Sequence, residues 1–124
     1  MGAQTNRMLS RVITVSHTTQ TTIVGVGREG VLNGGSTYTL TVDGTAGTGH
    51  AATSAAITVH IFRRATRGGA LAEDATPYTC VANKVTQVVL TPAVLNEYEI
   101  LATAQSAALT DEDVAVELSI QGAR

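Results

Sequence analysis

The stretch Thr37-Tyr38-Thr39-Leu40-Thr41-Val42 alternates threonine with a larger apolar side chain at every step. Successive side chains of a β-strand point to opposite faces of a sheet, so this spacing puts Tyr38, Leu40 and Val42 on one face and the threonines on the other. β-Branched threonine also favours extended backbone over helix. The stretch therefore predicts a strand with one buried face and one face in water.

The same two-residue period recurs on both sides of this stretch, in short runs separated by turn-forming residues. No run shows a convincing apolar spacing for an amphipathic helix. The predicted strands cover residues 11–16, 20–27, 37–42, 55–64, 78–81, 85–90, 97–105 and 114–121. Short strands at regular spacing predict an all-β, antiparallel, eight-stranded jelly-roll sandwich with the first strand near the last. A seven-stranded immunoglobulin-like sandwich is the alternative.

The apolar face of each predicted strand supplies the expected core. Aromatic residues make up only 3% of the chain and Trp is absent, so small aliphatic side chains must fill it, as suits two sheets packed face to face. The residues expected to be mostly buried are Ile13, Val15, Val24, Val26, Leu40, Val42, Ile57, Val59, Ile61, Val89, Ile100, Val116 and Leu118.

The chain of 124 residues has the size of one domain. Its first nine residues are polar apart from Met1, Ala3, Met8 and Leu9 and show no strand period. We therefore expect an N-terminal arm over residues 1–9 and a single β-sandwich domain over residues 10–124. The arm's order should depend on contacts outside the domain.

Charge and cysteine content exclude several classes of protein. The formal net charge of −2 argues against a general or sequence-specific nucleic-acid binder, which would need a basic surface. A lone cysteine, Cys80, allows no internal disulfide, permits assembly in a reducing cytoplasm, and is expected to be a small buried side chain. No apolar run approaches the roughly 18 residues that span a membrane, and the first six residues lack an apolar signal region.

Two glycine-rich stretches resemble nucleotide-binding motifs but lack their context. Residues 25–30 fit G-x-G-x-x-G, yet turn-forming residues follow where a dinucleotide site needs a helix. Residues 44–49 have the glycine spacing of a P-loop, but His50 and Ala51 stand where Lys and Ser/Thr are required. Both stretches are therefore interpreted as turns or loops, and no cofactor is expected.

The ionisable residues form no recognisable catalytic or metal-binding pattern. His17, His50 and His60 lie far apart without ligand-spaced partners, and Asp111-Glu112-Asp113 is interpreted as a solvated turn. Glu97 and Glu99 are alternate residues of one strand and could form an acid–base pair. An exposed, charged strand face is the simpler interpretation. We therefore expect no enzyme, no catalytic residue and no metal ligand.

One basic cluster and the expected arm supply the candidate protein interface. Arg63, Arg64 and Arg67 lie at the end of a predicted strand and could contact an acidic protein surface or a phosphate, or only water. Met8 and Leu9 could be buried against a partner, and Arg7 could form an ion pair there. The predicted interface therefore comprises Arg7, Met8, Leu9, Arg63, Arg64 and Arg67.

The strand order as a whole resembles a known group of proteins. A threonine-rich strand, 38–42, leads into a glycine-rich loop. The long strand 56–61 leads into a second loop, and the run 88–93 is followed by a tyrosine-centred strand, 97–100, and a final amphipathic strand. This pattern is similar to that of small jelly-roll structural proteins of tailed-phage virions, including capsid decoration (cement) proteins. No family-specific motif is matched residue by residue.

This resemblance implies a non-enzymatic virion protein that is assembled in the host cytoplasm and stabilises the head lattice. Its partners would be the major capsid protein or another virion protein, together with further copies of itself as a dimer or trimer. Another head or tail component, and a β-sandwich binding or adhesin module, are the alternatives.

Overall fold

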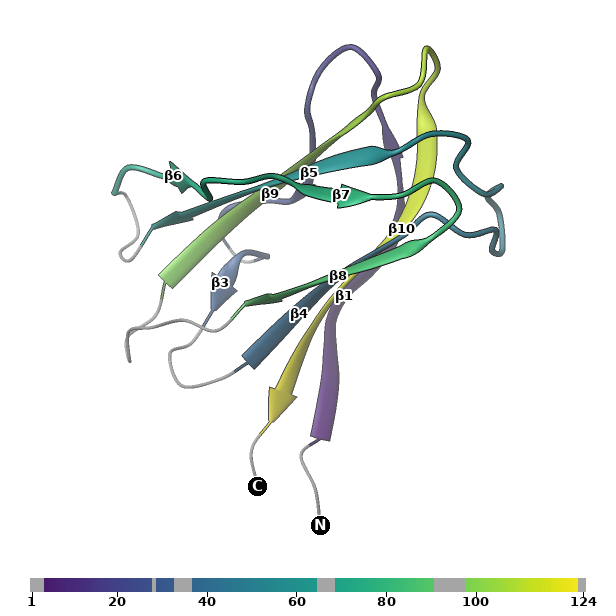
Figure 1. Cartoon of the computed structure of the whole chain (residues 1–124). Helices are drawn as coiled ribbons and strands as arrows, with labels where there is room; N and C mark the ends of the chain where they lie inside the picture. Colours follow the sequence, from purple (N-terminus) through teal and green to yellow (C-terminus); the bar gives the residue numbers. More distant parts are fainter. Residues whose placement is uncertain (1–3, 28, 33–36, 65–68, 91–97, 123–124) are drawn as a thin grey trace.

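The structure is a computed structural model that describes residues 4–27, 29–32, 37–64, 69–90 and 98–122 (Figure 1). The described residues form ten strands: β1 (Gln4–Val15), β2 (Thr21–Val24), β3 (Val31–Leu32), β4 (Thr37–Asp43), β5 (Ile57–Arg64), β6 (Ala72–Glu73), β7 (Tyr78–Cys80), β8 (Val85–Leu90), β9 (Tyr98–Ser106) and β10 (Glu112–Gly122). Within these ranges, no helix is long and apolar enough to cross a membrane.

The strands form two antiparallel sheets that pack face to face (Figure 1). Sheet A has the order β1-β10-β4-β8. In sheet B, β9 and β5 pair at the centre, β2 and β3 both pair with β9, and β6 and β7 both pair with β5. The described residues thus give an all-β sandwich, as predicted.

The strand order is that of a jelly roll. β2 and β3 occupy successive parts of one edge, as do β6 and β7, so the ten strands fill eight positions. If β2 with β3 counts as position 2 and β6 with β7 as position 5, the eight positions numbered along the chain run 1-8-3-6 in sheet A and 2-7-4-5 in sheet B. This is the order of a jelly roll. The prediction that the first strand lies near the last is confirmed, because β1 pairs with β10. The two short strands β3 and β6 were not predicted.

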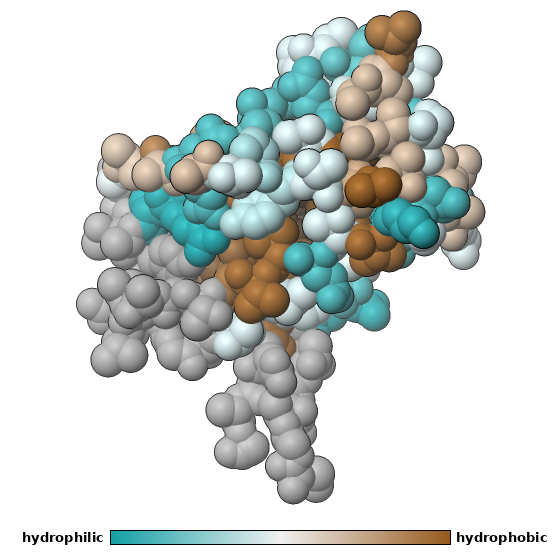
Figure 2. Space-filling model, viewed as in Figure 1, coloured by the Kyte–Doolittle hydropathy of each residue, from teal (hydrophilic) through white to brown (hydrophobic). Residues whose placement is uncertain are grey.

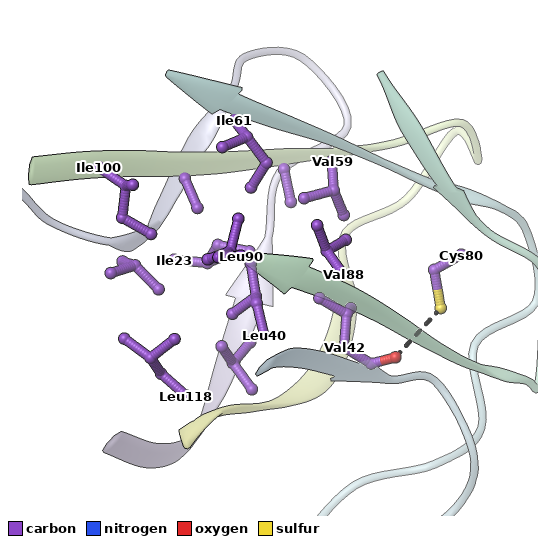
Figure 3. Close-up of a cluster of buried hydrophobic side chains, with 14 of the residues drawn as sticks. Ile23, Leu40, Val42, Val59, Ile61, Cys80, Val88, Leu90, Ile100 and Leu118 are labelled. Carbon is purple, nitrogen blue, oxygen red and sulfur yellow. Dashed lines mark hydrogen bonds between the residues drawn. The ribbon is translucent and has the colours of Figure 1, made fainter. Parts of the chain in front are cut away.

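The core lies between the sheets, and aliphatic side chains from both sheets meet there (Figure 3). Ten of the thirteen predicted core residues are buried: Val15, Val24, Leu40, Val42, Ile57, Val59, Ile61, Ile100, Val116 and Leu118. Ile13 is partly buried and packs against this cluster. Cys80 is also fully buried, and its thiol contacts the carbonyl of Val42 at 3.5 Å (Figure 3).

Two predicted core residues point to solvent instead. Val89 is 62% exposed, because Val88 and Leu90 face the core and their neighbour must face outward. Because Val88, Val89 and Leu90 are all apolar, the sequence does not show which of them face the core. Val26 is 45% exposed, because β2 ends at Val24 and Val26 lies in the following turn.

The predicted N-terminal arm is wrong for residues 4–9. These residues belong to β1, whose register with β10 runs from Gln4↔Gly122 to Val15↔Glu112. A shift in register between Arg7 and Leu9 marks a β-bulge at Met8, which breaks the two-residue period and conceals the strand in the sequence. Residues 1–3 lie outside the described residues.

Candidate protein-interaction surface

The outer face of sheet A is a continuous surface of small side chains. The registers place its residues in three rows across β1, β10, β4 and β8. We call this surface the A face. Its residues are Val12, Ala115, Asp43 and Val85 in the first row; Ser10, Glu117, Thr41 and Gln87 in the second; and Arg7, Ser119, Thr39 and Val89 in the third.

Most A-face residues are uncharged and short, and several valines lie open on it. Val12 is 48% exposed and Val85 is 49% exposed. Together with Val89 they place two exposed valines on β8 and one on β1. Figure 2 shows separate hydrophobic patches, divided by hydrophilic residues, in the region of β8. Exposed apolar side chains on a surface can be buried against another protein, and the neighbouring hydroxyl groups can form hydrogen bonds.

Each ionised group of the A face has a partner, either on the face itself or in the adjoining turn. Arg7 lies 3.7 Å from Glu117, which also accepts a hydrogen bond from the Ser119 hydroxyl at 2.9 Å. Asp43 accepts bonds from the N–H and the hydroxyl of Thr45. The surface therefore presents no strong field of one sign, which favours a protein partner over a polyanion.

Only part of the predicted N-terminal interface is available. Arg7 lies on the A face, and Met8 is 42% exposed at the bulge. Leu9 packs against the core cluster opposite Leu118, so its side chain already has its burial partner within the domain.

Arg63 is held within the domain by Asp74. Its guanidinium donates to both Asp74 oxygens, at 2.8 and 2.7 Å, and the Tyr78 hydroxyl donates to the same carboxylate at 2.8 Å. Burial alone would raise the pKa of Asp74, but the hydrogen bonds from Arg63 and Tyr78 and the charge of Arg63 together lower it. The hydrogen bond to Asp74 raises the pKa of Tyr78, as does its burial.

Arg64 is held in the same way by Glu99, its cross-strand neighbour on the outer face of sheet B. Its Nε and Nη2 both donate to Glu99 Oε1, at 2.9 and 2.7 Å, while Gly27 N–H donates to Oε2. Glu99 is only 2% exposed, so the expectation of an exposed acidic strand face is wrong for it. A buried carboxylate needs such partners, and removing one typically costs about 3–5 kcal/mol.

The predicted interface is therefore not one surface. Arg7 lies on sheet A, whereas Arg63 and Arg64 lie on β5 of sheet B in internal ion pairs. Arg67 lies outside the described residues, as does Glu97. The sequence alone does not predict the ion pairs of Arg63 and Arg64, because their partners Asp74 and Glu99 come from other segments of the chain.

The turn at 25–30 is a structural element, as predicted. Gly27 has a positive φ of 84°, which suits glycine. Glu29 accepts bonds from Arg11 at 2.9 and 3.0 Å and from Gly25 N–H at 2.9 Å. These bonds, with the charge of Arg11, lower the pKa of Glu29 against the effect of burial. Arg11 thereby ties β1 of sheet A to the turn beside sheet B.

The acidic run 111–113 joins separate segments at one end of the sandwich. Asp111 accepts bonds from the ring and the N–H of His17, which lower its pKa. Glu112 accepts from the N–H and hydroxyl of Ser54, and Asp113 accepts from the Thr14 hydroxyl. Each carboxylate thus has a partner from another segment, which a solvated turn would not require.

The described residues show no metal-binding cluster: no three His, Cys, Asp or Glu side chains among them gather closely enough to hold an ion. His60 Nδ1 lies 2.7 Å from Glu73, and His17 contacts Asp111. The loop at 44–49 closes through a bridge between Gly47 and His50.

Comparison with known proteins gave one distant match. No protein-family model matches the chain, and no curated protein matches it. Among solved structures, the chain is similar to the CBM22-1–GH10 modules of the N-terminal endo-1,4-beta-D-xylanase 10B of Clostridium thermocellum, complexed with xylohexaose, with 13% identity and a TM-score of 0.43. The match covers 99% of this chain and 26% of that chain, so this chain spans about a quarter of its length. A likeness this weak supports neither a fold nor a ligand here.

Proposed function

We propose that this protein is a structural component of a tailed-phage particle, most simply a decoration protein that docks on the capsid lattice through the A face. The observation that carries the proposal is the A face itself: a wide sheet surface with exposed valines and half-buried threonines, on which the arginine is paired with the glutamate. The exposed valines of such a surface can be buried against another protein.

The ionisable side chains support a scaffold role. Arg63 and Arg64 join neighbouring strands of sheet B to Asp74 and Glu99, and Arg11 ties β1 to the turn at 25–30. Glu99, which the sequence marked as a possible acid or base, thus holds segments of the sandwich together. A rigid sandwich that presents one broad face would add contacts to a shell without changing its own shape.

Co-sedimentation with capsid shells tests the proposal. Shells of the major capsid protein encoded in the same genome are mixed with the purified protein and pelleted. Wild type should pellet with the shells. Thr41→Arg places a long side chain at the centre of the A face and should weaken binding by at least about tenfold, because its bulk would hold the A face away from the shell.

Thr58→Arg is the matched control. Thr58 is also a half-buried threonine on an interior strand, but it belongs to sheet B. It should bind like wild type. Failure of the wild type to pellet with shells would contradict the decoration role. Binding to tail structures instead would favour another virion component, and binding to a glycan array would favour the adhesin module.

A further inference from the structure

The two sheets leave four strand edges, and three of them carry features that prevent pairing with another chain. An exposed sheet edge is a template for a further strand, and proteins protect edges with bulges, charges or short interrupted strands. The β1 edge has a bulge at Met8 and carries Arg7 and Arg11. The β2/β3 edge is divided into two short strands with a shifted register, and the β6/β7 edge into strands of two and three residues.

The β8 edge has none of these features. Its register with β4 runs without interruption from Tyr38↔Leu90 to Asp43↔Val85. Its sequence, Val85-Thr86-Gln87-Val88-Val89-Leu90, contains no charge and no proline. Among the described strands, β4 alone pairs with it.

We infer that β8 pairs antiparallel with β8 of a second copy of this chain, centred on Gln87. Val85, Gln87 and Val89 share the outer face and are all exposed. In this arrangement each Val85 lies opposite Val89 of the other copy, and the two Gln87 residues are opposite each other on the twofold axis, each with its amide 3.3 Å from the Thr41 hydroxyl of its own chain. No like charges oppose one another, and the pairing is self-complementary, as a twofold interface requires.

The neighbouring strand β7 leaves this edge open. The Thr86 hydroxyl donates to the carbonyl of Thr79 at 3.1 Å. Thr86 has the same parity as the buried Val88 and Leu90, so this contact comes from the inner side of sheet A. Pairing would join two four-stranded sheets into one and bring two A faces side by side. The inference holds whether or not the protein belongs to a phage particle.

Charged substitutions of Gln87, which lies on the twofold axis, test the pairing. The isolated protein is studied by analytical ultracentrifugation from micromolar to millimolar concentrations. Wild type should dimerise. Gln87→Lys and Gln87→Glu should each raise the dissociation constant by at least about tenfold, because like charges then face each other. An equimolar mixture of the two variants should restore the dimer as a heterodimer.

Ser10→Lys is the control, because Ser10 lies in the same A-face row on the opposite edge. It should dimerise like wild type. A wild type that stays monomeric throughout overturns the inference and leaves this edge for a strand of another protein. If Gln87→Lys still dimerises like wild type, or if Ser10→Lys weakens the dimer as much as Gln87→Lys does, then the β8 edge does not form the dimer. A mixture that stays monomeric overturns the antiparallel register.

Discussion

Single charged residues hold this sandwich together more than the composition suggests. Asp74 binds Arg63 and Tyr78 at once, and this arrangement connects the segment before β7 to the end of β5. Asp74 N–H also donates to the carbonyl of Ile61. The protonation state of this one carboxylate should therefore affect the stability of the fold.

Replacing Asp74 with Asn should alter how stability depends on pH. The pKa of Asp74 lies below its ordinary value near 3.8, so the unfolded chain takes up the proton first as the pH falls. The stability from this group is present above that value and is lost as the pH falls through the lower, folded pKa. Asp74→Asn should reduce stability at neutral pH and weaken its decline in acid, as measured by urea denaturation at several pH values.

Tyr78→Phe provides the intermediate case for this prediction. It removes one donor to Asp74 and leaves the two bonds from Arg63 in place. The decrease in unfolding free energy of Tyr78→Phe on acidification should be smaller than that of wild type and larger than that of Asp74→Asn. An acid dependence that is identical in all three proteins would show that Asp74 does not contribute to it.

The burial of a side chain was predictable where apolar and polar residues alternate clearly. It was not predictable where distant segments of the chain cover the side chain. Tyr38, Leu40 and Val42 alternate with threonine and are all buried. Glu99 also obeys its alternation and faces outward from sheet B, yet Arg64 and the turn at Gly27 bury it. The sequence of β9 alone does not predict these partners, because Arg64 lies on β5 and Gly27 lies in a turn more than 70 residues away in the chain.

At the scale of elements, short interrupted strands depend on turns that sit close to a neighbouring strand. The turn at 25–30 separates β2 from β3 and leaves both paired with β9. The carbonyl of Gly30 accepts the N–H of Ile100 at 2.8 Å. A side chain at Gly30 would meet the Ile100 oxygen at 2.1 Å, so only glycine fits there without movement.

Gly30→Ala should destabilise the fold by about 1–3 kcal/mol, because its methyl group collides with rigid backbone of β9. Gly25→Ala is the control within the same turn, since its methyl would meet its nearest neighbour, the Glu29 carboxylate, at an ordinary 3.5 Å. Thermal denaturation of both variants measures the difference. Equal midpoints would show that the turn relaxes without cost.

The regular strands could be read from the sequence, whereas these interruptions could not. Strands such as β4 and β5 carry enough alternating residues to reveal their period. β3 and β6 have two residues each, too few for any period, and owe their extended backbone to pairing with β9 and β5.

For the molecule as a whole, the jelly-roll topology places four strands in one broad sheet, and Val12, Val85 and Val89 lie exposed on its outer face. The chain closes through β1 and β10, so the described ends lie side by side on sheet A (Figure 1). The predicted interface joined residues from two sheets. We propose a single sheet face instead, with β8 as the edge through which a second copy would extend it.

Electron cryo-microscopy of capsid shells saturated with the protein tests the central claim most directly. The proposed role predicts jelly-roll density at regular lattice positions, with the A face against the shell. Shells that carry no ordered density, or density that contacts the shell through the outer face of sheet B, would contradict it.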